Sequence, residues 1–327
     1  MSTNDPEARF QSALAPFMDQ FVQEKRACGY QYRSSARLLS RFDQFLCNEA
    51  LPPGELPLTI TRKWLAKRPH ETASTHQGRL SVVRQFTEFL CRLGYRADVP
   101  DGSFTVKDGA SFTPRIFTHA EVQLLLHAVD QLTPDARGPL RHLIMPEVFR
   151  LLYGCGFRLD EVLHLRVADV DLDRGVLTVR EGKFGKDRLV PPAVSLVQRL
   201  QKYAVDFGTR PPDAFFFPAP NGGPWWKGTV YRLFRKLLLR CAIPHAGRGK
   251  GPRVHDMRHT FAVHTLLRWY REGADLDAKL PVLATYLGHQ SLLGTQRYLH
   301  LTAELFPQIT VRVNAAFGDV IPRRSLS

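Results

Sequence analysis

The sequence predicts a mainly α protein of the α+β class, with an N-terminal four-helix bundle and a mostly helical second domain that carries one small antiparallel sheet. Three observations lead to this prediction. Apolar residues recur at three- and four-residue steps over most of the chain. A polar stretch rich in Gly, Ser, Thr and Asp separates two such regions. One hairpin pattern interrupts the helices of the second region. The 327 residues suffice for two domains with separate cores.

The four-helix bundle is expected over residues 1–100. Helical spacing of apolar residues predicts helices over residues 10–29, 34–51 and 75–93, with a shorter helix between the last two. Thr59 or Thr61 is expected to cap this short helix, and Trp64 and Leu65 to point inward.

The short helix and the last helix of the bundle show basic residues on their outward faces. These are Arg62, Lys63, Lys67, Arg79 and Arg84. Such residues usually form a solvated face, but two basic helices can also hold a DNA backbone. Across the chain, 45 Lys and Arg outnumber 31 Asp and Glu, for a net charge of +14. An excess of this size favours a polyanionic partner, nucleic acid above all.

Residues 101–117 are expected to be a linker, and residues 118–327 a second domain. Thr118 and Glu121 have the spacing of a capping box, so they predict the first helix of that domain. The pattern around the turn EGKFGK predicts a hairpin with strands over residues 175–180 and 187–190, and residues 215–217 are a candidate third strand.

A later helix over residues 230–241 turns apolar residues inward and basic residues outward, among them Arg232, Arg235 and Lys236. Pro146 lies in another helical segment, where it is expected to start or kink the helix.

The sequence also indicates where the protein works. No apolar run approaches the roughly 20 residues that a membrane helix needs, and the start MSTNDPEARF has neither the basic flank nor the apolar core of a signal peptide. The five cysteines are scattered and odd in number, which favours reduced thiols. We expect a cytoplasmic protein without membrane association.

Five short segments of the second domain carry the residues that suggest chemistry. Their central residues are Arg158 in GFRLDEVLHLR, Lys183 in EGKFGKDRLVPP, His255 and Arg258 in VHDMRHTF, His289 in LGHQS and Tyr298 in TQRYLHL. Each segment alone has an ordinary structural explanation. Taken together, in this order and spacing, they resemble the tyrosine recombinase or phage integrase family over residues 118–318.

The resemblance rests on particular matches. Gly156, Phe157 and Arg158 are followed three residues later by Glu161. The hairpin matches GK-x-x-K-x-R-x-V-P through Lys183, Lys186, Arg188 and Pro191, and Tyr298 stands nine residues after the His of LGH. The arrangement is similar to that of two-domain Xer-like members, with a SAM-like core-binding bundle before the catalytic fold. The charged segment over residues 268–279 resembles a subset carried by transposon-like elements, and no arm-binding domain is expected before residue 9.

The resemblance implies a site-specific recombinase that cuts and rejoins double-stranded DNA through a 3′-phosphotyrosyl bond, with no metal or other cofactor. It makes Tyr298 the nucleophile, His255 the base, His289 a donor to the phosphate, and Lys183 the general acid. Glu161 anchors loops of the site. Lys186 and the outward basic residues listed above are expected to contact DNA.

Physical chemistry agrees with these roles. A phosphodiester in its transition state needs positive charge, and the guanidinium forks of Arg158 and Arg258 bind phosphate oxygens in pairs and stay charged. With a reference pKa near 10, Tyr298 is only about one part in a thousand phenolate at pH 7, so it needs a base and a positive site.

The family reaction implies four subunits on two DNA sites, with accessory recombinases in some systems. An apolar pattern after the nucleophile predicts a C-terminal helix with Leu305, Phe306, Ile309, Val313 and Phe317. That helix either docks on a neighbouring subunit or packs on its own domain.

Two rival hypotheses remain open. His255 and His259 have the i, i+4 spacing of a zinc-binding helix, although Asp256 replaces the Glu of H-E-x-x-H. The other rival is a DNA-binding protein of the same fold that has lost catalysis. Metal analysis tests the first rival, and covalent trapping tests the second.

Overall fold

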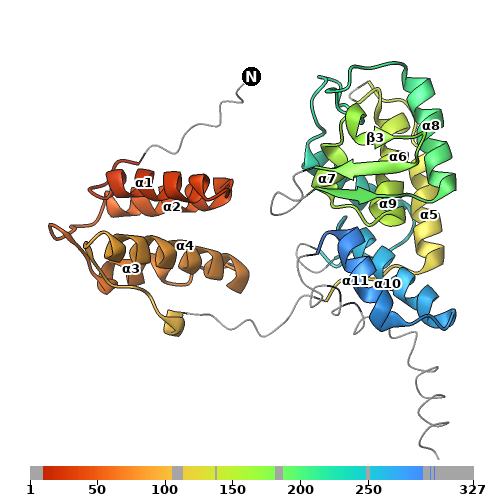
Figure 1. The fold of residues 1–327 in the computed structure, drawn as a ribbon. Helices are drawn as coiled ribbons and strands as arrows, with labels where there is room; N and C mark the ends of the chain where they lie inside the picture. The colour runs from red at the N-terminus through yellow and green to blue at the C-terminus, as the bar shows by residue number, and fades with distance from the viewer. Residues whose placement is uncertain are drawn as a thin grey trace, which may run out of the picture. The chain divides into compact units, whose positions relative to one another are not determined.

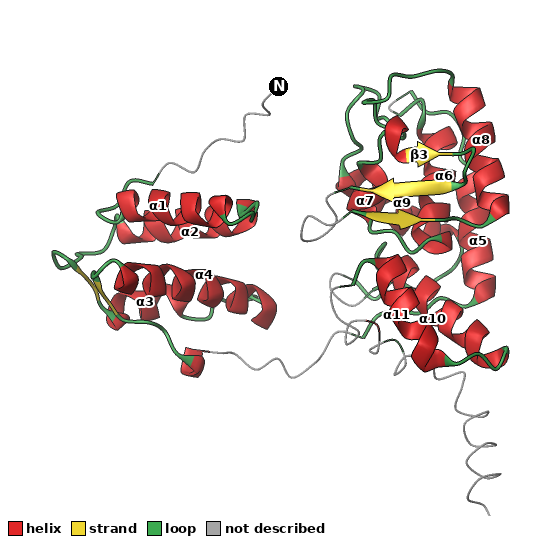
Figure 2. Ribbon diagram, viewed as in Figure 1, coloured by secondary structure: helices red, strands yellow, loops and turns green. Residues whose placement is uncertain are grey.

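The computed structural model describes residues 10–104, 113–136, 138–180, 187–247 and 251–289, together with Thr295 and Tyr298. The chain divides into two compact units, Met1–Phe112 and Thr113–Ser327 (Figure 1). The division falls inside residues 101–117, where the sequence predicts a linker. Both units are built mainly of helices, as Figure 2 shows.

Unit 1 contains four α-helices in its described part: α1 (Ala15–Ala27), α2 (Arg33–Leu46), α3 (Leu58–Leu65) and α4 (Ala73–Arg92). Its core is rich in aromatic side chains, among them Phe21, Phe42, Trp64 and Phe86. The two-residue strands β1 (Glu55–Leu56) and β2 (Arg96–Ala97) pair in parallel. The predicted bundle is confirmed, and the helices end within a few residues of their predicted bounds.

The expected cap of α3 is wrong. The residue before the helix is Pro57, and Thr61 lies inside α3, where its hydroxyl donates to the carbonyl of Leu58 at 3.0 Å. Pro57 is extended, with φ −73° and ψ 153°, so the chain enters the helix without a side-chain cap.

The expectation that Arg79 faces solvent is also wrong. Its side chain is 2% exposed, and Nη1 donates to both carboxylate oxygens of Glu71 at 2.9 and 2.8 Å. The guanidinium also lies over the ring of Trp64, 4.3 Å from its centroid. Arg79 is therefore part of the core of unit 1 and is not a candidate for DNA contact.

Unit 2 has seven described α-helices: α5 (His119–Asp130), α6 (Arg141–Gly154), α7 (Leu159–Leu163), α8 (Val194–Phe207), α9 (Lys227–Arg240), α10 (Asp256–Arg271) and α11 (Leu276–Leu287). Helix α6 is central, because it packs against α5, α7, α8 and α10. The predicted capping box of Thr118 and Glu121 is confirmed at the start of α5. In α9 the predicted outward residues Arg232, Arg235 and Lys236 are exposed.

The sheet of unit 2 is antiparallel, in the order β3 (Val170–Asp171), β4 (Val176–Val179) and β5 (Arg188–Val190). The two strands of the predicted hairpin are confirmed as β4 and β5. The predicted third strand over residues 215–217 is wrong, because that segment makes only an isolated bridge from Phe215 to Arg166. Phe216 and Phe217 are buried in the core, and the next residue, Pro218, has no amide hydrogen to extend a ladder.

Pro146 does not start a helix. Helix α6 begins at Arg141, so the proline lies inside it. Among the described helices, none is both long and apolar enough to cross a membrane.

Candidate active site

The site begins at a tight turn between α6 and α7. Gly156 has a φ of +61°, which favours glycine, and a Cβ there would lie 2.5 Å from Phe261 and 2.7 Å from Leu287. Only glycine lets α10 and α11 approach the turn this closely. The turn leads directly into Arg158, which precedes the first residue of α7.

Arg158 is held on two sides. Its backbone amide donates to Glu161 Oε2 at 2.8 Å, and its Nη1 donates to Glu161 Oε1 at 2.6 Å. Its Nη2 donates to the carbonyl of Gly288 at 3.0 Å. The side chain keeps 22% of its surface exposed, so the guanidinium is oriented and still reachable.

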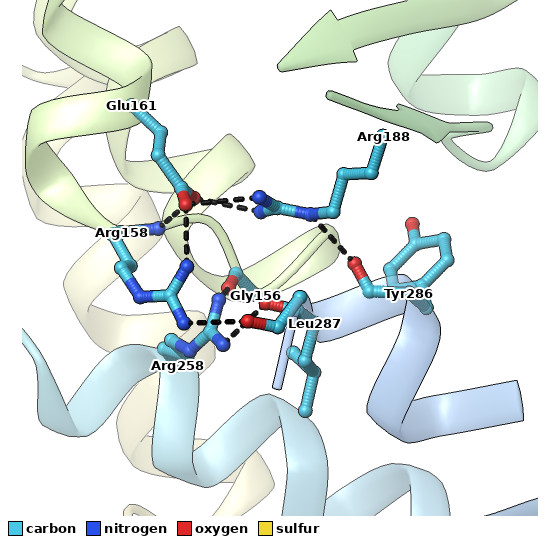
Figure 3. A network of polar contacts seen from close by, with 8 residues as sticks. Gly156, Arg158, Glu161, Arg188, Arg258, Tyr286 and Leu287 are labelled. Atoms are coloured by element: carbon cyan, nitrogen blue, oxygen red, sulfur yellow. Dashed lines mark hydrogen bonds and ion pairs between the residues drawn. The ribbon is translucent and has the colours of Figure 1, made fainter. Parts of the chain in front are cut away.

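Glu161 joins Arg158 to a second arginine (Figure 3). Arg188 at the start of β5 donates from Nη1 and Nη2 to the two carboxylate oxygens, at 2.9 and 2.7 Å. Burial alone would raise the pKa of Glu161, but the hydrogen bonds and charges of Arg188 and Arg158 hold it below its usual range. Glu161 is therefore an ionised, 8% exposed carboxylate between two guanidiniums.

Arg258, on α10, lies beside this pair. Its side chain is 1% exposed, with Nη1 donating to the carbonyl of Gly156 and Nη2 to the carbonyl of Leu287, both at 2.6 Å. Burial, and then the charge of Arg158, lower its pKa to about 10, so it remains protonated at neutral pH. Leu287 and Gly288 are consecutive, so the guanidiniums of Arg258 and Arg158 converge on the same end of α11.

The sequence L-G-H explains this convergence. The last carbonyls of a helix have no partner within the helix and carry partial negative charge, so they attract guanidiniums. Gly288 ends α11 with a φ of +68°, and the amide of His289 bonds back to the carbonyl of Ala284 at 2.9 Å. The same turn directs the His289 side chain toward the site.

Tyr298 completes the cluster. It is 4% exposed, and its hydroxyl lies 3.0 Å from Nδ1 of His259. Burial raises its pKa, while the positive charges of Arg258 and Arg158 act in the opposite direction. The phenol is protonated at neutral pH, with a ring nitrogen of His259 next to it.

Three histidines lie in this part of the site. Burial, and after it the positive charge of neighbouring groups, lowers the pKa of His255, His259 and His289 to about 4 each, so all three are neutral at pH 7. The ring of His255 lies 4.7 Å from that of His259. His289 faces Tyr298 with 6.0 Å between ring centroids, and its Nδ1 lies 2.8 Å from the Thr295 hydroxyl.

The structure brings most of the predicted residues together. Arg158, Glu161, Arg258, His289 and Tyr298 share one site, and His255 lies next to it. Lys183 and Lys186 fall in residues 181–186, outside the described residues. The remaining predicted DNA contacts, apart from Arg79, are exposed: Arg62, Lys63, Lys67, Arg84, Arg232, Arg235 and Lys236.

Sequence reasoning missed the roles of three residues. His259, not His255, lies within hydrogen-bond distance of the Tyr298 hydroxyl, although both histidines lie at one end of α10. Thr295 is fully buried and contacts His289. Arg188 pairs with Glu161. The available signal for Arg188 was strand alternation, which places it on the same side of β5 as the buried Val190.

The cluster suits an anionic substrate and a nucleophilic phenol. Two convergent guanidiniums provide fixed positive charge, and neutral imidazole next to Tyr298 provides a proton acceptor. Among the residues described, no three His, Cys, Asp or Glu side chains come together as a metal site would require.

Comparison with known proteins adds to this geometry. Residues 115–304 match the phage integrase family. A putative integrase/recombinase, y4rB, from Sinorhizobium fredii is 32% identical over 314 residues, which cover 94% of this chain and 99% of that protein. Tyrosine recombinase XerD from Ralstonia nicotianae is 32% identical over 244 residues, or 73% of each chain.

Solved structures share the fold. The Tn1549 transposon integrase in complex with transposon right end DNA is similar with a TM-score of 0.62 at 18% identity, covering 86% of this chain and 94% of that one. A lambda integrase dimer bound to a core site gives a TM-score of 0.58 at 15% identity, with the same coverage.

Proposed function

Because this chain belongs to the phage integrase family and is a site-specific tyrosine recombinase, we propose that Tyr298 attacks a DNA phosphate and forms a 3′-phosphotyrosyl bond, without a metal ion. The observation that carries the proposal is the convergence of Arg158 and Arg258 on the end of α11, next to the Tyr298 hydroxyl.

The two arginines would bind the scissile phosphate. Guanidinium forks match phosphate oxygens, and their charge offsets the charge that builds up in the transition state. Arg258 and Tyr298 are 1% and 4% exposed, so side chains around them must move before a phosphate reaches them.

Proton transfers complete the reaction. The contact between His259 and Tyr298 favours His259 as the first proton acceptor, with His255 beside it as the base that the family resemblance implies. His289 would donate a hydrogen bond to the phosphate. Lys183 would protonate the departing 5′-oxygen, which is a poor leaving group as an alkoxide.

Double-stranded DNA is the proposed substrate. Exposed basic residues on α3, α4 and α9 and in the loop after α3 would contact its backbone: Arg62, Lys63, Lys67, Arg84, Arg232, Arg235 and Lys236. Lys186 would contact it from the hairpin. Four subunits would act on two DNA sites in the cytoplasm, with the predicted C-terminal helix, which lies outside the described residues, exchanged between neighbours.

A nicked suicide substrate tests the proposal. The DNA site is first selected from random-sequence DNA by its binding to the protein. It is then nicked near the cleavage position, so that the short fragment released by cleavage diffuses away. The wild-type protein should form a covalent adduct that survives a denaturing gel, and Tyr298→Phe should form none. An adduct with Tyr298→Phe would overturn the assignment.

Two further outcomes separate the rival functions. Adduct formation should continue in excess EDTA, and its loss there would favour a zinc site at His255 and His259. A wild-type protein that binds the site tightly yet forms no adduct would favour a DNA-binding protein without catalysis.

A further inference from the structure

Arg188, at the start of the short strand β5, is more buried than expected for an arginine in that position. Its side chain is 9% exposed, although it lies next to the hairpin turn. The guanidinium fits against two groups of the site: it lies 5.9 Å from the Phe157 ring centroid, and a Cβ on Gly288 would come within 3.0 Å of its Nη1. Glycine at position 288 therefore leaves the space that Arg188 fills.

The hydrogen bonds of Arg188 link separate parts of the site (Figure 3). Nη1 and Nη2 bind both oxygens of Glu161, and Nε donates to the carbonyl of Tyr286 at 3.0 Å. One guanidinium thus ties the strand that leaves the Lys183 hairpin to α7 and to the last turn of α11. Arg158 and Arg258 bind at the same turn.

The charges explain why such a link matters. Glu161 forms an ion pair with Arg158, and this pair reduces the positive charge that Arg158 offers to a phosphate. Arg188 donates one hydrogen bond to each oxygen of Glu161, whereas the Arg158 guanidinium donates one, to Oε1. The carboxylate is thus neutralised mainly from the β5 side, and Arg158 is still held in place.

We propose that Arg188 is a positioning residue for strand cleavage. It acts through Glu161, which it orients and neutralises so that Arg158 stays fixed and available to the scissile phosphate. Arg188 itself does not touch DNA. This inference rests on the proposed function, because it concerns the phosphate bound by Arg158.

The main test measures DNA affinity and the single-turnover cleavage rate separately. Arg188→Gln should slow cleavage by about a hundredfold, the scale for a misplaced catalytic group. Its DNA affinity should stay within about threefold of wild type, as expected for a residue outside the DNA contacts. Arg188→Lys keeps the charge but loses the paired fork, so it should recover only part of the rate.

Arg199→Gln is the matched control. Arg199 lies in the same unit and donates to buried Glu147 at 2.7 Å, so its loss also leaves a buried carboxylate without its guanidinium. It joins α8 to α6, and its carboxylate partners in the described part of the chain, Glu147 and Asp130, both lie outside the site. Thermal unfolding should show both variants folded, with cleavage slowed only in Arg188→Gln. Equal slowing in both variants would reduce Arg188 to a general stabilising role and overturn the proposal.

A double variant tests whether Arg188 acts through Glu161. If it does, Arg188→Gln should add little to the defect of Glu161→Gln, because the carboxylate to be oriented is already gone. Independent roles would multiply the two defects. Multiplied defects, or a cleavage rate for Arg188→Gln within about threefold of wild type, would overturn the proposal.

A titration without DNA keeps this test separate from the proposed function. In Arg188→Gln the pKa of Glu161, followed by carboxyl NMR, should rise, because its main partner is lost. A normal adduct in wild type combined with an unchanged Glu161 titration would overturn the Arg188 proposal alone. No adduct in wild type would overturn the proposed function and this inference with it, whatever Glu161 shows.

Discussion

Both units bury arginine side chains, but the two regions balance the charge differently. In unit 1, Arg79 pairs with one carboxylate, Glu71, and the face of Trp64 lies against its guanidinium. In unit 2, Arg158 and Arg188 share the single carboxylate of Glu161, and the guanidinium of Arg258 beside them donates to backbone carbonyls. The first arrangement is neutral, and the second has a net positive charge.

This difference separates a structural arginine from a candidate catalytic one. A neutral buried pair has no excess positive charge to attract an anionic ligand. Each partner instead prevents the other from being buried as an unpaired charge. A cluster with excess positive charge is unfavourable by itself and becomes favourable when an anion binds. Whether a buried charge indicates function therefore depends on whether the positive and negative charges around it cancel.

The largest expected effect comes from replacing one arginine of each kind by alanine. Arg258→Ala should slow single-turnover cleavage by about a hundredfold to a thousandfold, since it removes an oriented positive donor. Arg79→Ala should leave the rate at saturating DNA near wild type and lower the free energy of unfolding by about 3–5 kcal/mol, because Glu71 loses its partner. Cleavage assays and denaturant titrations measure both. An Arg79→Ala variant that cleaves DNA slowly but keeps the wild-type free energy of unfolding would contradict the comparison.

Lys183→Ala sharpens the distinction between charge and proton supply. Without a general acid, cleavage should slow by about a hundredfold. A 5′-bridging sulfur should restore much of that rate, because a thiolate leaves without a proton. The same sulfur should not rescue Arg158→Ala, whose defect is charge stabilisation. Equal rescue of both variants would remove the general-acid role, and rescue of Lys186→Ala alone would move it to Lys186.

His259→Gln tests the contact with the nucleophile. Cleavage at pH 7 should slow by about tenfold or more, less than the roughly hundredfold or greater loss typical of a missing base, because His255 remains close enough to His259 to substitute. The rate of this variant should also rise more steeply with pH than that of wild type, as solvent hydroxide takes over. Single-turnover rates from pH 6 to 9 measure both effects. A wild-type rate in His259→Gln beside a slow His255→Gln would assign the base to His255.

The excess positive charge of the site also predicts how stability depends on pH. Burial and nearby arginines lower the pKa of His289 to about 4, whereas an unfolded histidine titrates near 6.5. Between these values the unfolded chain binds more protons, so stability is full above about pH 6.5 and falls as the pH drops toward about 4. His289→Asn should reduce the slope by up to about 1.4 kcal/mol per pH unit. Denaturant titrations at several pH values check this, and an unchanged slope would show that His289 is not buried in its neutral form.

How much the sequence could predict depends on how local each signal is. Helix α9, the capping box at Thr118 and the hairpin follow from spacings within one segment, and all three are confirmed. The burial of Arg79 could not be predicted, because it depends on Glu71 in a loop and on Trp64 in another helix. A basic residue on a helix is expected to face water unless its partner is known.

In the site, too, local patterns predicted residues but not their distant partners. The family motifs led to most of its residues, but the pairing of Arg188 with Glu161 spans 27 positions and two elements. The contact of His259 with Tyr298 spans 39 positions. In both cases the residue types were visible in the sequence, while the partner was set by how α7, β5 and α10 pack together.

The smallest expected effect lies on one helix, α4, where a buried and an exposed arginine stand five positions apart. Arg84 is 45% exposed and lies 3.7 Å from Glu88, whereas Arg79 is buried. If α4 holds the DNA backbone, Arg84→Ala should weaken binding a few-fold on every sequence. It should also reduce the slope of log affinity against log salt by about one, since one fewer phosphate is neutralised. Arg79→Ala should leave that slope unchanged, because its charge is already balanced by Glu71. Binding measured by fluorescence anisotropy over a range of salt concentrations gives both slopes. A reduced slope in Arg79→Ala with none in Arg84→Ala would mean that the bundle meets DNA through a different face.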